Sequence, residues 1–121
     1  MKKILVLGSQ GYIGTRLSSY LLEYGYSVIG IDLGTFAECL ISDNFTQNST
    51  ITKDVALMSK REFEGFDVVI NLASRSNDPT AGIDSGIYYE PAVKFSGNIA
   101  RICSDLGIKY IFPSSCSVYG A

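Results

Sequence analysis

Three glycines recur at three-residue intervals near the start of the chain: Gly8, Gly11 and Gly14, within the segment GSQGYIG. A turn of this composition lets backbone amides approach an anion, because glycine has no side chain to hold the anion away. If a helix begins at the turn, its first amides and partial positive charge favour a phosphate group. The same spacing also fits a turn that binds no ligand.

An acidic residue follows 18 positions after the last of these glycines. Asp32 ends the segment SVIGID, where a carboxylate can accept hydrogen bonds from the hydroxyl groups of an adenosine ribose. The carboxylate would repel a 2′-phosphate, and no arginine is close in sequence, so the pattern favours NAD over NADP. The alternative is that Asp32 is only a turn residue at a strand end.

Short apolar segments predict the strands that position these residues. The continuous runs at 2–8 and 67–73 are typical of strands buried on both faces of a parallel sheet. We expect three further strands at 27–32, 50–54 and 108–115. The last of them should fray or lie at a sheet edge at Pro113, because proline cannot donate to a strand ladder.

Helical spacing of apolar residues predicts helices from residue 11 to Tyr24, over 56–64 and over 91–106, while 34–49 has no clear period and predicts a loop. Glycines follow the first and last helices and are expected to end them. The side chains expected to face the sheet are Ile13, Leu17, Leu21 and Tyr24 in the first helix, and Ala92, Phe95, Ile99, Ile102 and Leu106 in the last.

The alternation of strands and helices predicts a parallel sheet with helical crossovers. Right-handed crossovers give the strand order 3-2-1-4-5, which is the α/β arrangement of a Rossmann-type fold. The chain of 121 residues is expected to form one dinucleotide-binding domain over 1–121.

Composition excludes several classes of partner. Ten basic and twelve acidic residues give a net charge of −2 without a concentrated basic run, so we expect no nucleic-acid partner. No apolar run approaches the roughly twenty residues that span a bilayer, so we expect no membrane partner. The chain has no histidine, and Cys39, Cys103 and Cys116 match neither a metal-ligand nor a disulfide spacing, which predicts no metal site and a reduced, cytoplasmic protein with small buried thiols.

With these motifs in place, the sequence resembles the NAD-dependent epimerase/dehydratase family, the extended short-chain dehydrogenases that act on nucleotide sugars. The resemblance runs along the whole chain and corresponds to the N-terminal portion of such an enzyme. Beyond the glycine turn and Asp32, it rests on Asp54-Val55, on Asn71-Leu72-Ala73-Ser74, on Ser96-Gly97-Asn98 and on the segment SSCSVYG that begins at Ser114.

The resemblance implies a cofactor site and one catalytic group. Ser115 would hydrogen-bond the sugar hydroxyl that is oxidised and help a tyrosine to remove its proton. From the residues alone, the favoured interpretation of Ser115 is a strand-end hydroxyl that caps the following turn. Asp54 and Val55 would contact the adenine ring, and the segment after the fourth strand would lie near the nicotinamide half. The NAD-binding residues implied in this way are Gly8, Gly11, Tyr12, Ile13, Gly14, Asp32, Asp54, Val55, Leu72, Ala73 and Ser74.

The chain departs from the family pattern at two helix positions and lacks its general base. Ala92 replaces the usual asparagine and Phe95 the usual small residue. None of the eight tyrosines has a lysine four residues later, so the family's Tyr-x-x-x-Lys pair is absent. We therefore expect a Rossmann domain truncated before the sixth strand, without the catalytic helix and substrate subdomain, that is inactive alone and meets a nucleotide sugar only in a complete enzyme.

Two further expectations remain open. The last strand would be left as an edge with Ile111 and Phe112 uncovered, which favours a homo-oligomer. The alternatives to a truncated epimerase or dehydratase are a non-catalytic nucleotide-binding or assembly module, and a structural domain whose glycine turn is empty.

Overall fold

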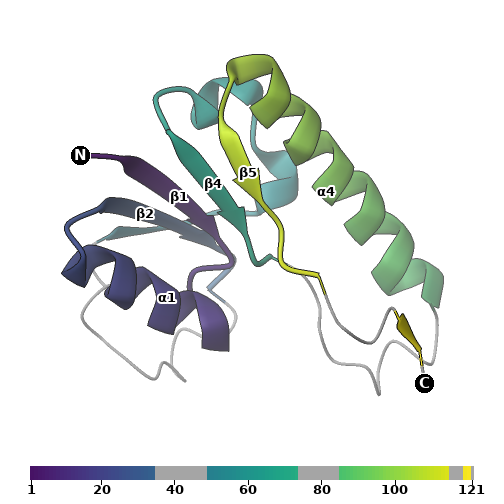
Figure 1. The fold of residues 1–121 in the computed structure, drawn as a ribbon. Helices are drawn as coiled ribbons and strands as arrows, with labels where there is room; N and C mark the ends of the chain where they lie inside the picture. Colours follow the sequence, from purple (N-terminus) through teal and green to yellow (C-terminus); the bar gives the residue numbers. More distant parts are fainter. Residues whose placement is uncertain (35–48, 74–84, 115–118, 121) are drawn as a thin grey trace.

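A parallel sheet forms the centre of the molecule, which is described here by a computed structural model. The described residues are 1–34, 49–73, 85–114 and 119–120, and of residues 85–92 only the backbone is described. Within these ranges, the strand order β3-β2-β1-β4-β5 confirms the predicted order 3-2-1-4-5 (Figure 1). The strands are β1 (Lys3–Leu7), β2 (Ser27–Asp32), β3 (Thr50–Thr52), β4 (Val68–Asn71) and β5 (Lys109–Ile111).

The two central strands are buried on both faces, as their continuous apolar runs predicted. Leu5 and Val69 pair in register and belong to one core cluster, whereas their neighbours Ile4 and Val68 belong to a second cluster. Successive side chains of a strand point to opposite faces, so each cluster fills one side of the sheet. Burial of this kind requires a layer of helix or turn on each face.

Helix α1 (Tyr12–Glu23) covers one face (Figure 1), but not with the predicted stripe. Leu17 and Leu21 pack against the core, whereas Ile13 and Tyr24 are 61% and 66% exposed. The buried positions of α1 are instead its small residues, Gly14, Thr15 and Ser18. The prediction was confirmed for Leu17 and Leu21 and wrong for Ile13 and Tyr24, because small residues rather than these two make the closest contacts of the helix.

Gly14 marks the closest approach of α1 to the strand before it. A Cβ built at position 14 would lie 2.2 Å from the carbonyl oxygen of Gly8 and 2.9 Å from the backbone of Ser9. Real Cβ atoms essentially never approach other atoms so closely, and both neighbours are backbone atoms that cannot move independently. Glycine is therefore required at position 14 by packing.

Helix α4 (Ser85–Leu106) covers the opposite face and begins at Ser85 rather than at residue 91 (Figure 1). The predicted start was wrong because it rested on apolar spacing alone; Pro91 lies inside the helix, where it lacks the amide that would donate a backbone hydrogen bond. Ile99 and Cys103 are buried against the sheet. The predicted face is confirmed for Phe95, Ile99, Ile102 and Leu106, while the side chain of Ala92 lies outside the described set.

Both long helices end as the glycines after them predicted. Tyr26 N–H donates to Leu21 O at 3.1 Å after α1, and Ile108 N–H donates to Cys103 O at 2.8 Å after α4. These bonds span a glycine, Gly25 or Gly107, and satisfy carbonyl groups of the last helical turn.

The helix predicted over 56–64 is wrong: the segment forms two short 3-10 turns, η2 (Val55–Leu57) and η3 (Lys60–Phe63). Each turn has its own cap, because Asp54 Oδ1 accepts a hydrogen bond from Ala56 N–H at 2.9 Å and Ser59 interacts with Glu62. Ser59 is extended, which breaks the segment between the turns. Phe63 is buried and anchors η3 to the core.

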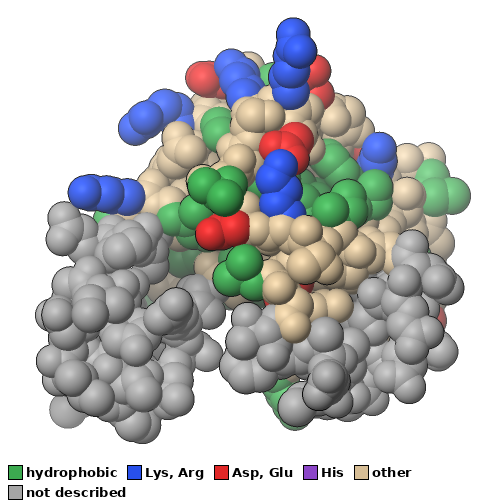
Figure 2. Space-filling model, turned by 180° about the vertical axis from the view of Figure 1, so that it is seen from behind, with side chains coloured by type: hydrophobic (Ala, Val, Ile, Leu, Met, Phe, Trp, Pro, Cys, Tyr) green, Lys and Arg blue, Asp and Glu red, His purple; other side chains and the backbone are tan. Residues whose placement is uncertain are grey.

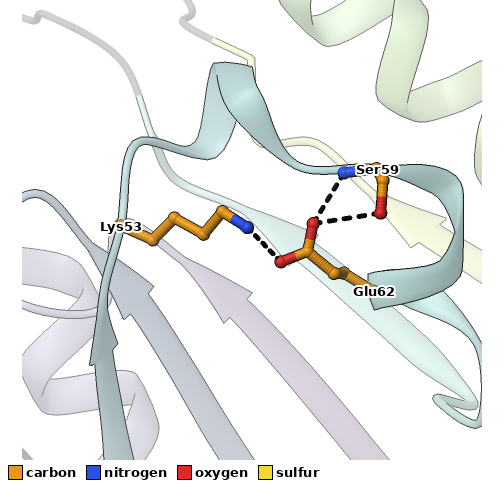
Figure 3. A network of polar contacts seen from close by, with 3 residues as sticks. All are labelled: Lys53, Ser59 and Glu62. Carbon is orange, nitrogen blue, oxygen red and sulfur yellow. Dashed lines mark hydrogen bonds and ion pairs between the residues drawn. The ribbon is translucent and has the colours of Figure 1, made fainter.

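Glu62 joins η3 to the end of β3 (Figure 3). One of its carboxylate oxygens pairs with Lys53 Nζ, and the other accepts from Ser59 N–H at 2.7 Å and Ser59 Oγ at 3.2 Å. The Lys53 ammonium and the Ser59 amide lower the pKa of Glu62. With Phe66 and apolar strand residues, this pair lines a cavity of about 150 Å³.

The last strand and the surface bear on the predicted partners. Strand β5 stops at Ile111, earlier than predicted, and Ile111 and Phe112 are 41% and 50% exposed. The oligomer inferred from this edge stays a prediction. Figure 2 shows the molecule from behind. In the described part of this view, lysine, arginine and carboxylate side chains lie among apolar ones.

Three further sequence expectations concern thiols, metal ions and membranes. Cys103 is a free, buried thiol, and burial raises its pKa; Cys39 and Cys116 lie outside the described residues. Within the described ranges, no group of three or more histidine, cysteine or acidic residues could hold a metal ion. No helix of those ranges is long and apolar enough to cross a membrane.

Replacing Gly14 with alanine is expected to lower the free energy of unfolding by about 1–3 kcal/mol, because the new methyl group overlaps the Gly8 carbonyl. The matched control is Gly97→Ala inside α4, where a Cβ meets nothing within 4 Å. It should raise stability by about 1 kcal/mol through helix propensity. Urea midpoints measure both, and equal midpoints for the two variants would contradict the packing argument.

Glu62→Gln is expected to flatten the acid dependence of stability. Because the pKa of Glu62 is lowered in the folded protein, its contribution is present above the ordinary glutamate value of about 4.3 and is lost as the pH falls through the lowered folded value. Urea midpoints from pH 7 to pH 3 should fall less in the variant than in the parent. Exposed Glu64→Gln is the control, and parallel curves for Glu62→Gln and the parent would refute the prediction.

Candidate functional site

The turn between β1 and α1 packs against the end of β4. Gly8 has φ +78°, a conformation that favours glycine. A Cβ on Gly8 would lie 2.8 Å from Ala73 N and 2.8 Å from Leu72 C, so the Leu72–Ala73 peptide rests directly on the turn. Gly8 N–H donates to Ile31 O at 2.8 Å, which ties the turn to β2 as well.

Several amide donors at the N-terminus of α1 have no backbone partner among the described residues. Its N-cap residue is Gly11, which supplies no side-chain cap, and the first turn holds no acidic residue. The first amide of the helix that reaches a backbone partner is Thr15 N–H, bonded to Gly11 O at 3.0 Å. The amides at Tyr12, Ile13 and Gly14 are the orphan donors of a helix start, and such donors bind anions.

Asp32 faces this turn. Its Oδ2 accepts a hydrogen bond from Gln10 N–H at 2.9 Å, and its Oδ1 accepts from Gly34 N–H at 3.0 Å. An ionised carboxylate has about four acceptor positions, so about two remain for hydroxyl groups of a ligand. The sequence predicted an acidic residue at a strand end near the glycine turn, and Asp32 lies there, bonded to Gln10 N–H.

Sequence reasoning missed both partners of Asp32. Gly34 carried a signal, since an aspartate whose side chain bonds the backbone two residues later is a common turn. Gln10 carried none, because its amide is brought to Asp32 only by the pairing of β1 with β2.

Two buried polar atoms lie in the same turn. Within the part of the chain that the structure describes, Ser9 Oγ and Gln10 Oε1 have no hydrogen-bond partner. Native proteins leave few such groups unpaired, and an orphaned one indicates a ligand, a water molecule or strain. The uncapped helix start, the spare acceptor positions of Asp32 and these orphaned atoms together fit a ligand that carries both phosphate and hydroxyl groups.

Asp54 and Val55 lie at the same edge of the sheet but have structural contacts. Thr52 is the register partner of Asp32, which places Asp54 just beyond the end of β3. The Asp54 carboxylate caps η2 through Ala56 N–H, and Val55 is buried in the core. Their contact with an adenine ring stays a prediction.

Asn71, the last residue of β4, is 1% exposed and satisfied at both ends of its amide. Its Oδ1 accepts from Ala73 N–H at 3.1 Å, and its Nδ2 donates to the hydroxyl of Tyr110 at 2.9 Å. The Tyr110 hydroxyl donates to Ser96 O at 3.4 Å, and burial raises the pKa of Tyr110. This network joins β4, β5 and α4, and no sequence pattern indicated it because the three residues are far apart along the chain.

The structure thus gathers most of the predicted residues at the carboxyl ends of β1, β2 and β4, where open α/β sheets bind ligands. Ser74 and Ser115 lie outside the described residues. The residues brought together are Gly8, Gly11, Tyr12, Ile13, Gly14, Asp32, Leu72 and Ala73.

Comparison with known proteins gives this arrangement a family. Protein CapI of Staphylococcus aureus is 30% identical, with 98% of this chain and 39% of that protein aligned. The UDP-glucuronate 4-epimerase of Thermodesulfobacterium geofontis is 28% identical, with 95% of this chain and 40% of that protein aligned. The chain therefore spans about two-fifths of the length of these relatives.

A solved structure of similar fold is the UDP-N-acetylglucosamine 4-epimerase of Methanobrevibacter ruminantium in complex with UDP-N-acetylmuramic acid. It superposes with a TM-score of 0.84 at 26% identity, over 98% of this chain and 39% of that one. The family model described as NAD dependent epimerase/dehydratase family matches residues 4–121. Since that match takes in the glycine turn, Asp32 and the strand ends around them, the chain belongs to the NAD-dependent epimerase/dehydratase family.

Proposed function

We propose that this chain is the NAD-binding portion of a nucleotide-sugar epimerase or dehydratase. The observation that carries the proposal is the hydrogen bond from Gln10 N–H to Asp32, 2.9 Å long, because it holds a carboxylate beside an uncapped helix start. Phosphate donors and a hydroxyl acceptor are then neighbours, as a dinucleotide requires.

Each group has a role that follows from its chemistry. The first-turn amides of α1 would bind the diphosphate, and the two spare acceptor positions of Asp32 would take the hydroxyl groups of the adenosine ribose. The negative charge of Asp32 disfavours a 2′-phosphate, which supports NAD over NADP. Leu72, Ala73 and Ser74 would lie along the nicotinamide half, and Asp54 and Val55 near the adenine.

The nucleotide-sugar part of the proposal rests on the relatives, whose names specify UDP-glucuronate and UDP-N-acetylglucosamine. In such a reaction, bound NAD supplies the acceptor for a hydride from a sugar carbon. Ser115 would hydrogen-bond the hydroxyl group at that carbon and orient it for loss of its proton.

The chain by itself is proposed to be inactive, because no tyrosine in it is followed four residues later by a lysine. In that pair, the lysine charge lowers the tyrosine pKa so that the phenolate can act as a base. The second candidate, a non-catalytic nucleotide-binding module, shares the same site. A Tyr-x-x-x-Lys further along the encoded polypeptide would favour the first candidate.

Asp32→Asn is expected to raise the Kd for NAD by about 10- to 150-fold, since hydrogen bonds to a charged group contribute about 1.5–3 kcal/mol. The variant should also lose much of its preference for NAD over NADP, because the carboxylate charge is gone. Titration calorimetry with both cofactors measures the two effects. Asp105→Asn, in the last turn of α4 with a side chain 55% exposed, is the matched control. Equal NAD affinity in parent and Asp32→Asn would overturn the assignment of Asp32.

The purified chain is expected to show no turnover of UDP-sugars in the presence of NAD. Absorbance of NADH and nuclear magnetic resonance of the sugar would detect oxidation and epimerisation. The same preparation should bind NAD in the calorimeter, which separates an inactive site from a misfolded protein. Clear turnover would show that a base outside the Tyr-x-x-x-Lys pattern serves the reaction.

A further inference from the structure

Asn71 occupies an unusual position for a polar side chain, since it is only 1% exposed at the carboxyl end of β4. Its neighbours in β4 are apolar and pack into the two core clusters. Burying an amide there is costly unless both its donor and acceptor groups are paired. Asn71 meets this condition with Ala73 N–H on one side and Tyr110 on the other.

The acceptor side of Asn71 acts on the cofactor turn. Its Oδ1 holds the amide of Ala73, and the nitrogen of that amide is one of the atoms a Cβ on Gly8 would meet at 2.8 Å. Leu72 N–H donates to a different acceptor, Leu7 O, at 2.8 Å. The orientation of the Leu72–Ala73 peptide against Gly8 therefore depends on the Asn71 side chain.

Tyr110 determines the direction in which the NH₂ group of Asn71 points. Because the Tyr110 hydroxyl donates to Ser96 O, its oxygen is free to accept, and it accepts from Asn71 Nδ2. This directs the NH₂ group of Asn71 towards β5 and its carbonyl oxygen towards Ala73. Without the hydroxyl, the amide would lose the contact that distinguishes its two ends.

We infer that Asn71 and Tyr110 form a positioning pair for NAD binding. Tyr110 orients the Asn71 amide, and Asn71 holds the Leu72–Ala73 peptide in the place that keeps the Gly8 turn in its binding geometry. Neither residue needs to touch the cofactor. This inference deepens the proposed function and rests on it.

Tyr110→Phe removes only the hydroxyl group and is expected to raise the Kd for NAD about tenfold, the equivalent of one misplaced hydrogen bond. Calorimetry is done well below the melting temperature of each protein, so that a loss of stability does not enter. Tyr26→Phe, a partly exposed tyrosine just after α1, is the matched control. An unchanged Kd in Tyr110→Phe would overturn the inference.

The double variant Asn71→Leu/Tyr110→Phe separates positioning from mere packing. Removing both partners leaves no unpaired side-chain group between them. The melting temperature of the double variant should therefore lie closer to that of the parent than the melting temperature of Tyr110→Phe does. NAD affinity should stay about tenfold weaker, because Ala73 N–H still lacks the Asn71 oxygen. Recovery of both quantities would show that the pair only fills the core, and the inference would fail.

If the parent itself does not bind NAD, the proposed function fails and the pair is judged by amide hydrogen exchange. Faster exchange at Ala73 and at Gly8 in Tyr110→Phe than in the parent would support the coupling of the pair to the turn. Unchanged exchange at both amides would reject that coupling. The two failures are therefore distinguishable.

Discussion

The carbonyl oxygen of Gly8 lies only 2.2 Å from the place that a side chain at position 14 would occupy. This contact seats α1 directly on the turn that leaves β1, with no room for a side chain between them. The buried residues of α1 are accordingly small ones, Gly14, Thr15 and Ser18, while Ile13 is exposed. It also brings the first-turn amides of α1 to the carboxyl end of β1, so the constraint that shapes the packing also positions the amides that we propose to bind phosphate.

Neighbouring strands stabilise that turn from two sides. Asp32, at the end of β2, accepts from Gln10 N–H, and the Leu72–Ala73 peptide, beyond β4, packs on Gly8. Because the strands are parallel, their carboxyl ends meet at one edge, and residues far apart in the sequence become neighbours there. The Asp32 carboxylate thus holds the turn, and in the proposed function its remaining acceptor positions would bind a ribose.

The opposite face is covered by different means. Helix α4 packs Ile99 and Cys103 on the sheet, while two short 3-10 turns complete the layer. Glu62 ties the second turn to Lys53 (Figure 3), which compensates for the few backbone hydrogen bonds of so short an element. A polar network of Asn71, Tyr110 and Ser96 crosses this side of the sheet and reaches the peptide that contacts the cofactor turn.

The sequence by itself determined the strands, their order, the glycine turn and the acid beside it, because these follow from local periodicity and from the handedness of crossovers. It also determined where both helices end, since Gly25 and Gly107 act within a few residues. Tertiary structure alone decided which face of α1 is buried, that residues 56–64 form two turns, that Gln10 N–H bonds Asp32 and that Asn71 meets Tyr110. Each of these depends on how closely distant segments approach, and no pattern of neighbouring residues encodes that distance.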